Sequence, residues 1–383
     1  MDVTAFLFSF FYLILHPGNN IYRKSMSTKK ILITLSAIFI CLIPNRLHAQ
    51  KGKWFASSDV KLGGYFIGKY DWNDQKGKDQ NGGLDLRFIR LYLDGHCFDD
   101  FYYKIQAEMS GAPGDDKGPR ALDAFVEWQK WKEMRIKVGQ FKRPFTFENP
   151  YNPWNVGFGS YSQIVSKLSG MSDRVGEHSS GGRDLGVQLQ GDFFPSSDKT
   201  FHWLHYQIGL FNGQGINHSD KNKFKDLIGG MWISPVKNLS IGGFGWMGRY
   251  ANEKYTDGSG MPKNVDRNRW GVGLKYEDSW TIRGEYVASE GRKANSVQSS
   301  DKADGWYALL GVPVTSKLKL YGKWDCYRDN KTWESMKSIW GVAANYTLYK
   351  NLMLQANYSF THDRTQRIDK DYNTIDLQVY VRF

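Results

Sequence analysis

The chain has 383 residues, of which 41% are hydrophobic, 15% aromatic and 23% charged. This aromatic content excludes a disordered chain, because the rings bury enough surface to offset the loss of chain entropy. After the N-terminal region no stretch reaches the roughly 20 apolar residues of a membrane-spanning helix, which excludes a helical membrane protein.

The first expected element is a targeting signal. From residue 26 the chain begins with positively charged residues and continues with an apolar run over 31–43. A cleavage site with a small residue at its end, Ala49, follows. This order is typical of a signal peptide, which we place at 26–49, and it predicts export from the cytoplasm. A signal anchor is the alternative. Residues 1–25 are interpreted as an upstream extension with no part in the fold.

From residue 60 onward, apolar and polar residues alternate with a period of two. In 98–109, aromatic and aliphatic residues hold the odd positions from 101 and polar residues hold the even ones. Half-buried strands show this pattern. We expect sixteen strands, at 60–72, 83–94, 98–109, 121–129, 134–143, 184–194, 203–212, 225–234, 238–250, 267–277, 280–290, 304–315, 318–328, 338–348, 351–362 and 373–383.

The connectors between these segments alternate between short and long along the chain, with 144–183 the longest. Outer-membrane barrels have short turns on the periplasmic side and longer loops outside. The sequence therefore predicts an all-β protein, a 16-stranded antiparallel transmembrane β-barrel over 50–383. Its surroundings would be outer-membrane lipid and lipopolysaccharide. A soluble β-sandwich or propeller is the alternative, but neither would show this alternation.

The connector 144–183 is rich in aromatic residues, among them Phe145, Phe147, Tyr151 and Trp154. Long connectors of this kind are usually functional or disordered, and the aromatic content favours a folded one. A sixteen-stranded barrel is wide enough to hold it. We expect the connector to fold inward and set the pore radius. A surface loop that caps the barrel or binds a neighbour is the alternative.

The inward faces of the expected strands carry nearly equal numbers of basic and acidic residues, which predicts cross-strand ion pairs. In 83–94 the polar face shifts between Arg87 and Arg90, which predicts a β-bulge. The full chain has a net charge of +12; without 1–49, which hold five basic residues and one acidic residue, it has +8.

One row of cations stands out on the polar face of 134–143 and just beyond it. Arg135, Lys137 and Arg143 share one parity beside the long connector, whose own cations include Lys167, Arg174 and Arg183. Rings of Arg or Lys select anions in pores. We take these six residues as candidate pore-lining and anion-binding residues. A structural polar lumen is the alternative.

The segment from Gly139 to Glu148, GQFKRPFTFE, resembles the G-x-F-K-x-P-F-G-x-E motif of the phosphate-selective porin O and P family. It departs from the motif at Thr146, where the family usually has Gly. The final strand ends in Phe383, which is similar to the C-terminal aromatic signature of outer-membrane barrels. The resemblance implies a homotrimer of sixteen-stranded barrels that pass anions along basic residues.

Other chemistry finds little support in the sequence. No CxxC, HExxH, GxSxG or phosphate-loop motif occurs, so we expect no metal, no cofactor and no enzymatic activity. The cations are interleaved with acids, which disfavours binding to nucleic acid. The expected barrel and the family resemblance together imply a porin for small polar or anionic solutes, such as phosphate. A general non-selective porin, a structural or adhesive barrel, and a barrel whose wall carries a hydrolase dyad are the alternatives.

Overall fold

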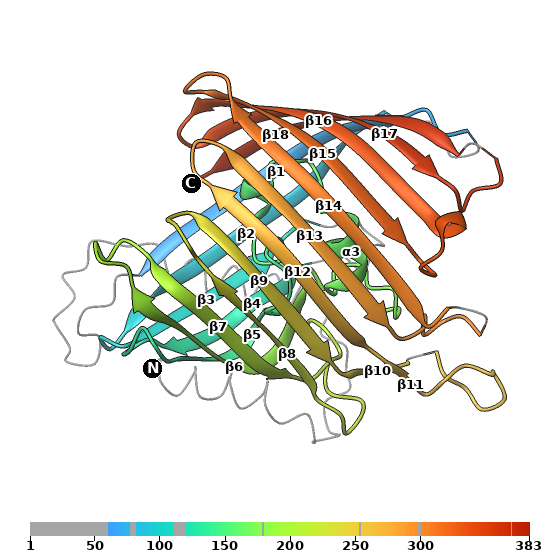
Figure 1. The fold of residues 1–383 in the computed structure, drawn as a ribbon, viewed down its shortest axis with the longest axis horizontal. Coiled ribbons are helices and arrows are strands. Elements are labelled where there is room, and N and C mark those ends of the chain that lie inside the picture. Colours follow the sequence, from blue (N-terminus) through green and yellow to red (C-terminus); the bar gives the residue numbers. More distant parts are fainter. Residues whose placement is uncertain are drawn as a thin grey trace. The chain divides into compact units, whose positions relative to one another are not determined.

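The computed structural model describes residues 60–76, 82–110, 119–177, 180–252, 254–297, 300–368 and 370–383. The expected signal peptide and upstream extension lie outside these residues. Sixteen of the strands form one closed barrel (Figure 1). They are β1 (Lys61–Asn73), β2 (Gly83–Cys97), β3 (Phe101–Glu108), β4 (Arg120–Trp128), β5 (Arg135–Lys142), β6 (Arg183–Pro195), β7 (His202–Phe211), β8 (Asp226–Ile233), β9 (Leu239–Met247), β12 (Asn268–Glu277), β13 (Thr281–Glu290), β14 (Lys302–Pro313), β15 (Leu318–Arg328), β16 (Met336–Tyr349), β17 (Leu352–Asp363) and β18 (Asp371–Arg382).

Every barrel strand pairs antiparallel with its neighbours, and β1 pairs with β18 to close the sheet. Two short strands, β10 (Arg249–Ala251) and β11 (Asn264–Asp266), form a separate hairpin in the connector after β9. The predicted sixteen-stranded antiparallel barrel is confirmed. Since consecutive strands reverse direction, all the short turns lie at one end of the barrel and all the long connectors at the other.

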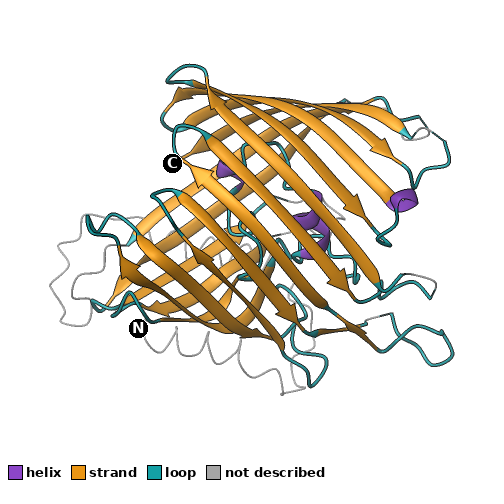
Figure 2. Cartoon of the chain, viewed as in Figure 1, coloured by secondary structure: helices purple, strands orange, loops and turns teal. Residues whose placement is uncertain are grey.

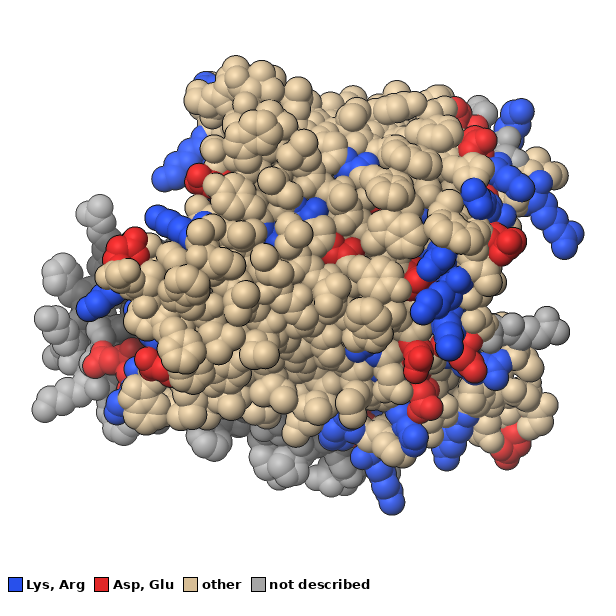
Figure 3. Space-filling view, viewed as in Figure 1, with Lys and Arg blue, Asp and Glu red and all other residues tan. Residues whose placement is uncertain are grey.

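The period-two alternation places apolar side chains on the outer wall and polar ones in the lumen. Val138 on β5 and Val187 on β6 are register partners, and about half of each side chain is exposed. The view in Figure 3 shows a broad band of uncharged residues across the strands, with charged residues gathered toward the two ends. An outward apolar band between polar ends is what a lipid bilayer requires of a barrel.

The predicted bulge in β2 is confirmed at Arg87. The register of β1 against β2 jumps from the pair Ile67 and Phe88 to the pair Gly68 and Leu86, so Arg87 has no partner on β1. One extra residue reverses the parity of the strand. The bulge therefore lets both Asp85 and Arg90 face the lumen, although their numbers differ in parity.

The segment between β5 and β6 lies inside the barrel, where it forms the short 3₁₀-helix η1 (Pro153–Asn155) and the helix α3 (Gln163–Leu168) (Figure 2). Its buried Phe145, Phe147 and Phe158 join one hydrophobic cluster with lumen-facing residues such as Phe244 and Tyr307. The lumen of this barrel therefore contains a packed core.

No helix among the described residues is both long enough and apolar enough to cross a membrane.

Candidate functional site

The inward connector, residues 144–183, is held on one wall by carboxylates that accept hydrogen bonds from its backbone. Glu285 on β13 accepts from the backbone N–H groups of Phe147 (2.6 Å) and Glu148 (3.0 Å). Asp325 on β15 accepts from the backbone N–H of Gln163 (3.0 Å), at the start of α3. A buried N–H group without a partner costs free energy, so these contacts fix the backbone path of the connector as well as its side chains.

A second set of contacts surrounds the indole of Trp246, which is 1% exposed on β9. The guanidinium carbons of Arg143, Arg267 and Arg269 lie 4.9, 4.6 and 4.9 Å from its ring centroid. Cations at this distance are attracted to the face of an indole ring. Trp246 also donates its indole N–H to Asp226 (2.8 Å).

Each of these three arginines is paired with carboxylates that are themselves buried. Arg143 contacts Glu177 (3.0 Å) and Asp184 (2.9 Å), Arg267 contacts Glu177 and Asp226 (both 2.5 Å), and Arg269 contacts Asp173 (2.6 Å). We call these eight residues the Trp246 cluster: Trp246, Arg143, Arg267, Arg269, Asp173, Glu177, Asp184 and Asp226. It joins the connector to β6, β8, β9 and β12, and its charges nearly cancel.

The pKa of Asp173 shows how strongly the cluster holds its charged form. Burial alone would raise the pKa of this carboxyl, but the guanidinium of Arg269, with its hydrogen bonds, and then Arg267 lower it to about 2. An opposite charge within a few ångströms favours the ionised carboxylate. Asp173 is therefore ionised at neutral pH, and its contact with Arg269 is a charged one.

The segment that opens the connector needs two unusual backbone conformations. Gly139 has φ +131°, and a Cβ there would lie 2.2 Å from the carbonyl oxygen of Ala124. Thr146 has φ +68°, in the left-handed region that favours glycine. Its hydroxyl accepts a hydrogen bond from the backbone N–H of Asn149 (3.1 Å). The departure from the family motif at Thr146 thus leaves the left-handed turn in place, with a hydroxyl that closes it.

Between the connector and the wall formed by β1 to β7 lies a cavity of about 340 Å³, which we call the lumen cavity. Its lining extends from Tyr102, near the short-turn end of β3, to Asp123 and Arg183, near the long-loop end of β4 and β6. The cavity therefore runs along much of the barrel wall. Its charged lining residues are Arg90, Lys104, Lys137, Lys142, Arg143, Arg183 and Asp123.

Several of the lining cations are paired with carboxylates on other strands of the same wall. Arg90 contacts Glu108 (2.5 Å), Arg183 contacts Asp123 (2.7 Å) and Lys137 contacts Glu127 (3.6 Å). These pairs agree with the cross-strand pairing expected from the sequence. They leave the local charge close to zero and hold the long side chains against the wall.

Two lining cations have no carboxylate partner among the residues that the structure describes. Lys104 Nζ lies 5.2 Å from the ring centroid of Tyr92. Lys142 Nζ donates to the carbonyl oxygens of Asn149 (2.6 Å) and Tyr151 (2.7 Å). Neither arrangement cancels the positive charge. The lumen cavity therefore has an excess of positive charge that the Trp246 cluster lacks.

The six residues predicted from the sequence fall in different places. Lys137, Arg143 and Arg183 line the lumen cavity, although Arg143 has no exposed surface. Arg135, on the same face of β5 as Lys137, is paired with Asp192 (2.5 Å). Their role in anion binding stays a prediction.

The other two predicted residues lie on the connector away from the cavity lining. Arg174 donates to the carbonyl oxygens of Gly291, Ser300 (3.1 Å) and Asp329 (3.0 Å) in other long loops. Lys167 is exposed in the last turn of α3.

Sequence reasoning missed Lys142, Arg267 and Trp246. Lys142 has the outward parity of its strand, and no local pattern indicates that its Nζ reaches the connector. Arg267 precedes β12, and its partners Glu177 and Asp226 lie 90 and 41 residues away in the sequence. Only the three-dimensional fold brings them together.

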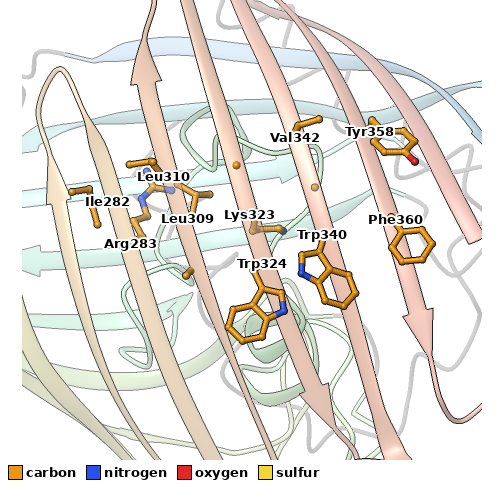
Figure 4. Close-up of a pocket in the computed structure, with 13 residues that line it drawn as sticks. Ile282, Arg283, Leu309, Leu310, Lys323, Trp324, Trp340, Val342, Tyr358 and Phe360 are labelled. Carbon is orange, nitrogen blue, oxygen red and sulfur yellow. The ribbon is translucent and has the colours of Figure 1, made fainter. Parts of the chain in front are cut away.

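A further hollow, of about 670 Å³, lies on the outer wall across β13 to β17. Gly322 leaves open space there, and Trp324, Trp340 and Phe360 lie along one side of it (Figure 4). The apolar side chains around this hollow point toward lipid. It is larger than the lumen cavity but belongs to the membrane-facing surface.

A closed sixteen-stranded barrel with an apolar outer wall and a charged lumen, narrowed by an inward connector, defines the class of bacterial outer-membrane porins. Residues 60–228 match the model of the family described as phosphate-selective porin O and P. The family resemblance predicted from the segment Gly139 to Glu148 is thereby confirmed, and the chain is an outer-membrane porin. None of the curated proteins compared with the chain matches it significantly.

Solved structures show the same fold. The anion-selective porin from Comamonas acidovorans is 14% identical, with 85% of this chain and 100% of that chain covered and a TM-score of 0.61. In-vitro folded OmpT of Vibrio cholerae, in a trimer form, is 13% identical, with 86% of this chain and 100% of that chain covered and a TM-score of 0.58. The outer-membrane channel DcaP of Acinetobacter baumannii is 14% identical, with 88% of this chain and 100% of that chain covered and a TM-score of 0.57.

Proposed function

We propose that this porin passes small anions, such as phosphate, by passive diffusion through the lumen cavity. The observation that carries the proposal is the pair of cations, Lys104 and Lys142, whose charges no carboxylate among the described residues cancels. A cation in a narrow, partly desolvated passage attracts anions more strongly than one in bulk water. The family description and the anion-selective porin from Comamonas acidovorans support the same direction.

Lys104 contributes to this preference mainly by its charge. Its side chain is half-buried on the inward face of β3, and its Nζ lies over the ring of Tyr92. Lys142 is held by two carbonyl oxygens of the connector, so its Nζ is fixed in place. Since most other cations in the cavity have carboxylate partners, the expected preference for anions is modest.

The reversal potential of the reconstituted porin across a KCl gradient tests the proposal. We expect the sign of the reversal potential to show that chloride permeates better than potassium. The variant Lys104→Gln should give a smaller reversal potential of the same sign. Lys237→Gln, in the short turn before β9, is the matched control and should leave the potential unchanged. A cation-selective wild type, or a Lys104→Gln variant with the wild-type potential, would contradict the proposal.

We also propose that the barrel is a homotrimer surrounded by outer-membrane lipid and lipopolysaccharide, and that it has no enzymatic activity. The trimer form of the Vibrio cholerae OmpT structure supports the assembly. Among the described residues no group of three or more His, Cys, Asp or Glu side chains is placed to hold a metal. The mass of the unheated protein in mild detergent tests the trimer, and a monomeric mass would refute it.

A further inference from the structure

A row of amide side chains lies beside the cations of the lumen cavity. Gln188 and Gln190 on β6 face the lumen with Gln207 on β7, and all three line the cavity. Gln188 is the register partner of Lys137 on β5, so an amide and an ammonium group are neighbours on the wall. Directly opposed residues in a sheet are close enough for their side chains to act together.

A carboxylate fixes the orientation of these amides. Glu127 is paired with Lys137, and a carboxylate in such a pair can only accept hydrogen bonds. Gln190 therefore directs its NH₂ group at Glu127 and donates to it. This leaves the carbonyl oxygen of Gln190 to accept from the NH₂ group of Gln188 (2.6 Å).

The chain of hydrogen bonds ends on an unused acceptor. Because Gln188 uses its NH₂ group toward Gln190, its carbonyl oxygen is left over, and this buried oxygen has no hydrogen-bond partner among the described residues. The residue is 4% exposed and lines the lumen cavity. A buried acceptor without a partner is costly, so a solute that carries a donor is favoured there.

We propose that the lumen cavity favours organic anions that carry a hydroxyl group close to the charge, such as 2-hydroxy acids, over anions without one. The uncompensated positive charge of the cavity lining attracts the anion, and the carbonyl oxygen of Gln188 accepts a hydrogen bond from the hydroxyl. The inference rests on the proposed anion channel and specifies its substrate class. Chloride offers no donor and leaves the acceptor of Gln188 unused.

Lactate and propionate test the proposal, because they have the same charge and similar size and differ by one hydroxyl. Their permeability ratio is obtained from the reversal potential measured with a lactate salt on one side of the membrane and a propionate salt on the other. We expect lactate to be favoured by about fivefold, the factor that one hydrogen bond of ordinary net strength supplies. Gln188→Met keeps the shape and removes the acceptor, so the lactate-to-propionate permeability ratio should fall to about one.

Two further variants separate the amide chain from general charge effects. Gln129 also donates to the carboxylate of Glu127 (3.1 Å) but does not line the cavity. Gln129→Met should therefore change neither the lactate-to-propionate ratio nor the chloride-to-potassium preference. Glu127→Gln removes the group that orients the amides and also one negative charge. It should lower the lactate preference and raise the chloride preference.

Equal permeabilities of lactate and propionate in the wild type would overturn the inference. An unchanged ratio in Gln188→Met would do the same, even with anion selectivity intact. A wild type that prefers potassium to chloride would instead refute the proposed anion channel. If Gln188→Met does not fold, Glu127→Gln tests the inference without a change at Gln188. A lactate-to-propionate ratio that stays at the wild-type value in Glu127→Gln would then overturn the inference.

Discussion

The lumen of this porin holds two charged regions of opposite character. In the Trp246 cluster, three buried arginines face four buried carboxylates, and the net charge is close to zero. In the lumen cavity, Lys104 and Lys142 keep charges that no described carboxylate cancels. The comparison shows that the number of arginines in a pore is a poor guide to its selectivity. What matters is which cations remain uncompensated where a solute can pass.

The largest expected effect comes from breaking the Trp246 cluster. Arg267→Met leaves Glu177 and Asp226 without the guanidinium that joins them, and removing one partner of a buried pair costs about 3–5 kcal/mol. We expect a lower unfolding temperature and faster proteolysis of the connector, both measured on the purified barrel. Arg249→Met removes an ion pair with Asp266 that is largely exposed, and should cost less than about 1 kcal/mol. Equal losses in the two variants would contradict the distinction between buried and exposed pairs.

The next effect concerns selectivity and compares paired with unpaired cations. Changing Arg135 and Lys137 together to Gln leaves Asp192 and Glu127 in the lumen without their partners. The change removes two positive charges, whereas Lys104→Gln removes one. We therefore expect the reversal potential of the double variant to move further toward cations than that of Lys104→Gln. An unchanged potential in the double variant would show that this part of the wall does not influence the permeating ions.

The strands could be predicted from the sequence because each depends on a local pattern. The segment 318–328 was predicted with the bounds that β15 has, and the parity shift in 83–94 located the bulge at Arg87. The Trp246 cluster could not be predicted, because its ion pairs join residues 34 to 96 positions apart. Lys142 was missed for a different reason. Its parity points outward, and only the path of the connector brings carbonyl oxygens to its Nζ.

A smaller effect is expected from pH. The pKa of Asp173 is lowered to about 2, below its ordinary value, so its contribution to stability is complete above the ordinary value and is lost as the pH falls toward 2. The contact between Asp173 and Arg269 should therefore contribute a constant amount to the free energy of unfolding from neutral pH down to about pH 4. Asp173→Asn removes the charge that Arg269 needs, so this variant should be less stable than the wild type by the same amount at about pH 7 and at about pH 5 in denaturant melts. A difference that shrinks between these two pH values would contradict the prediction.

The smallest expected effect is at Thr146. Thr146→Gly removes about 1–2 kcal/mol of left-handed strain but also loses the hydrogen bond from Asn149 and adds chain entropy to the unfolded state. These terms nearly cancel, so the free energy of unfolding should change by less than about 1 kcal/mol. Thr146→Ala keeps the strain and loses the acceptor, and should be the less stable of the two in denaturant melts. The reverse order would show that the left-handed strain at residue 146 is smaller than the chain entropy that glycine adds to the unfolded state.

The contacts of the connector with the last strand determine when it can reach its final position. Gln378 on β18 donates to the carbonyl oxygen of Gly159, 219 residues earlier in the chain, and the ring of Trp154 lies 5.7 Å from that of Tyr380. These contacts can form only after the whole chain has been synthesised and β18 has joined the sheet. The narrowing of the pore is therefore a late step of assembly, and a barrel that has not yet closed cannot have its final permeability.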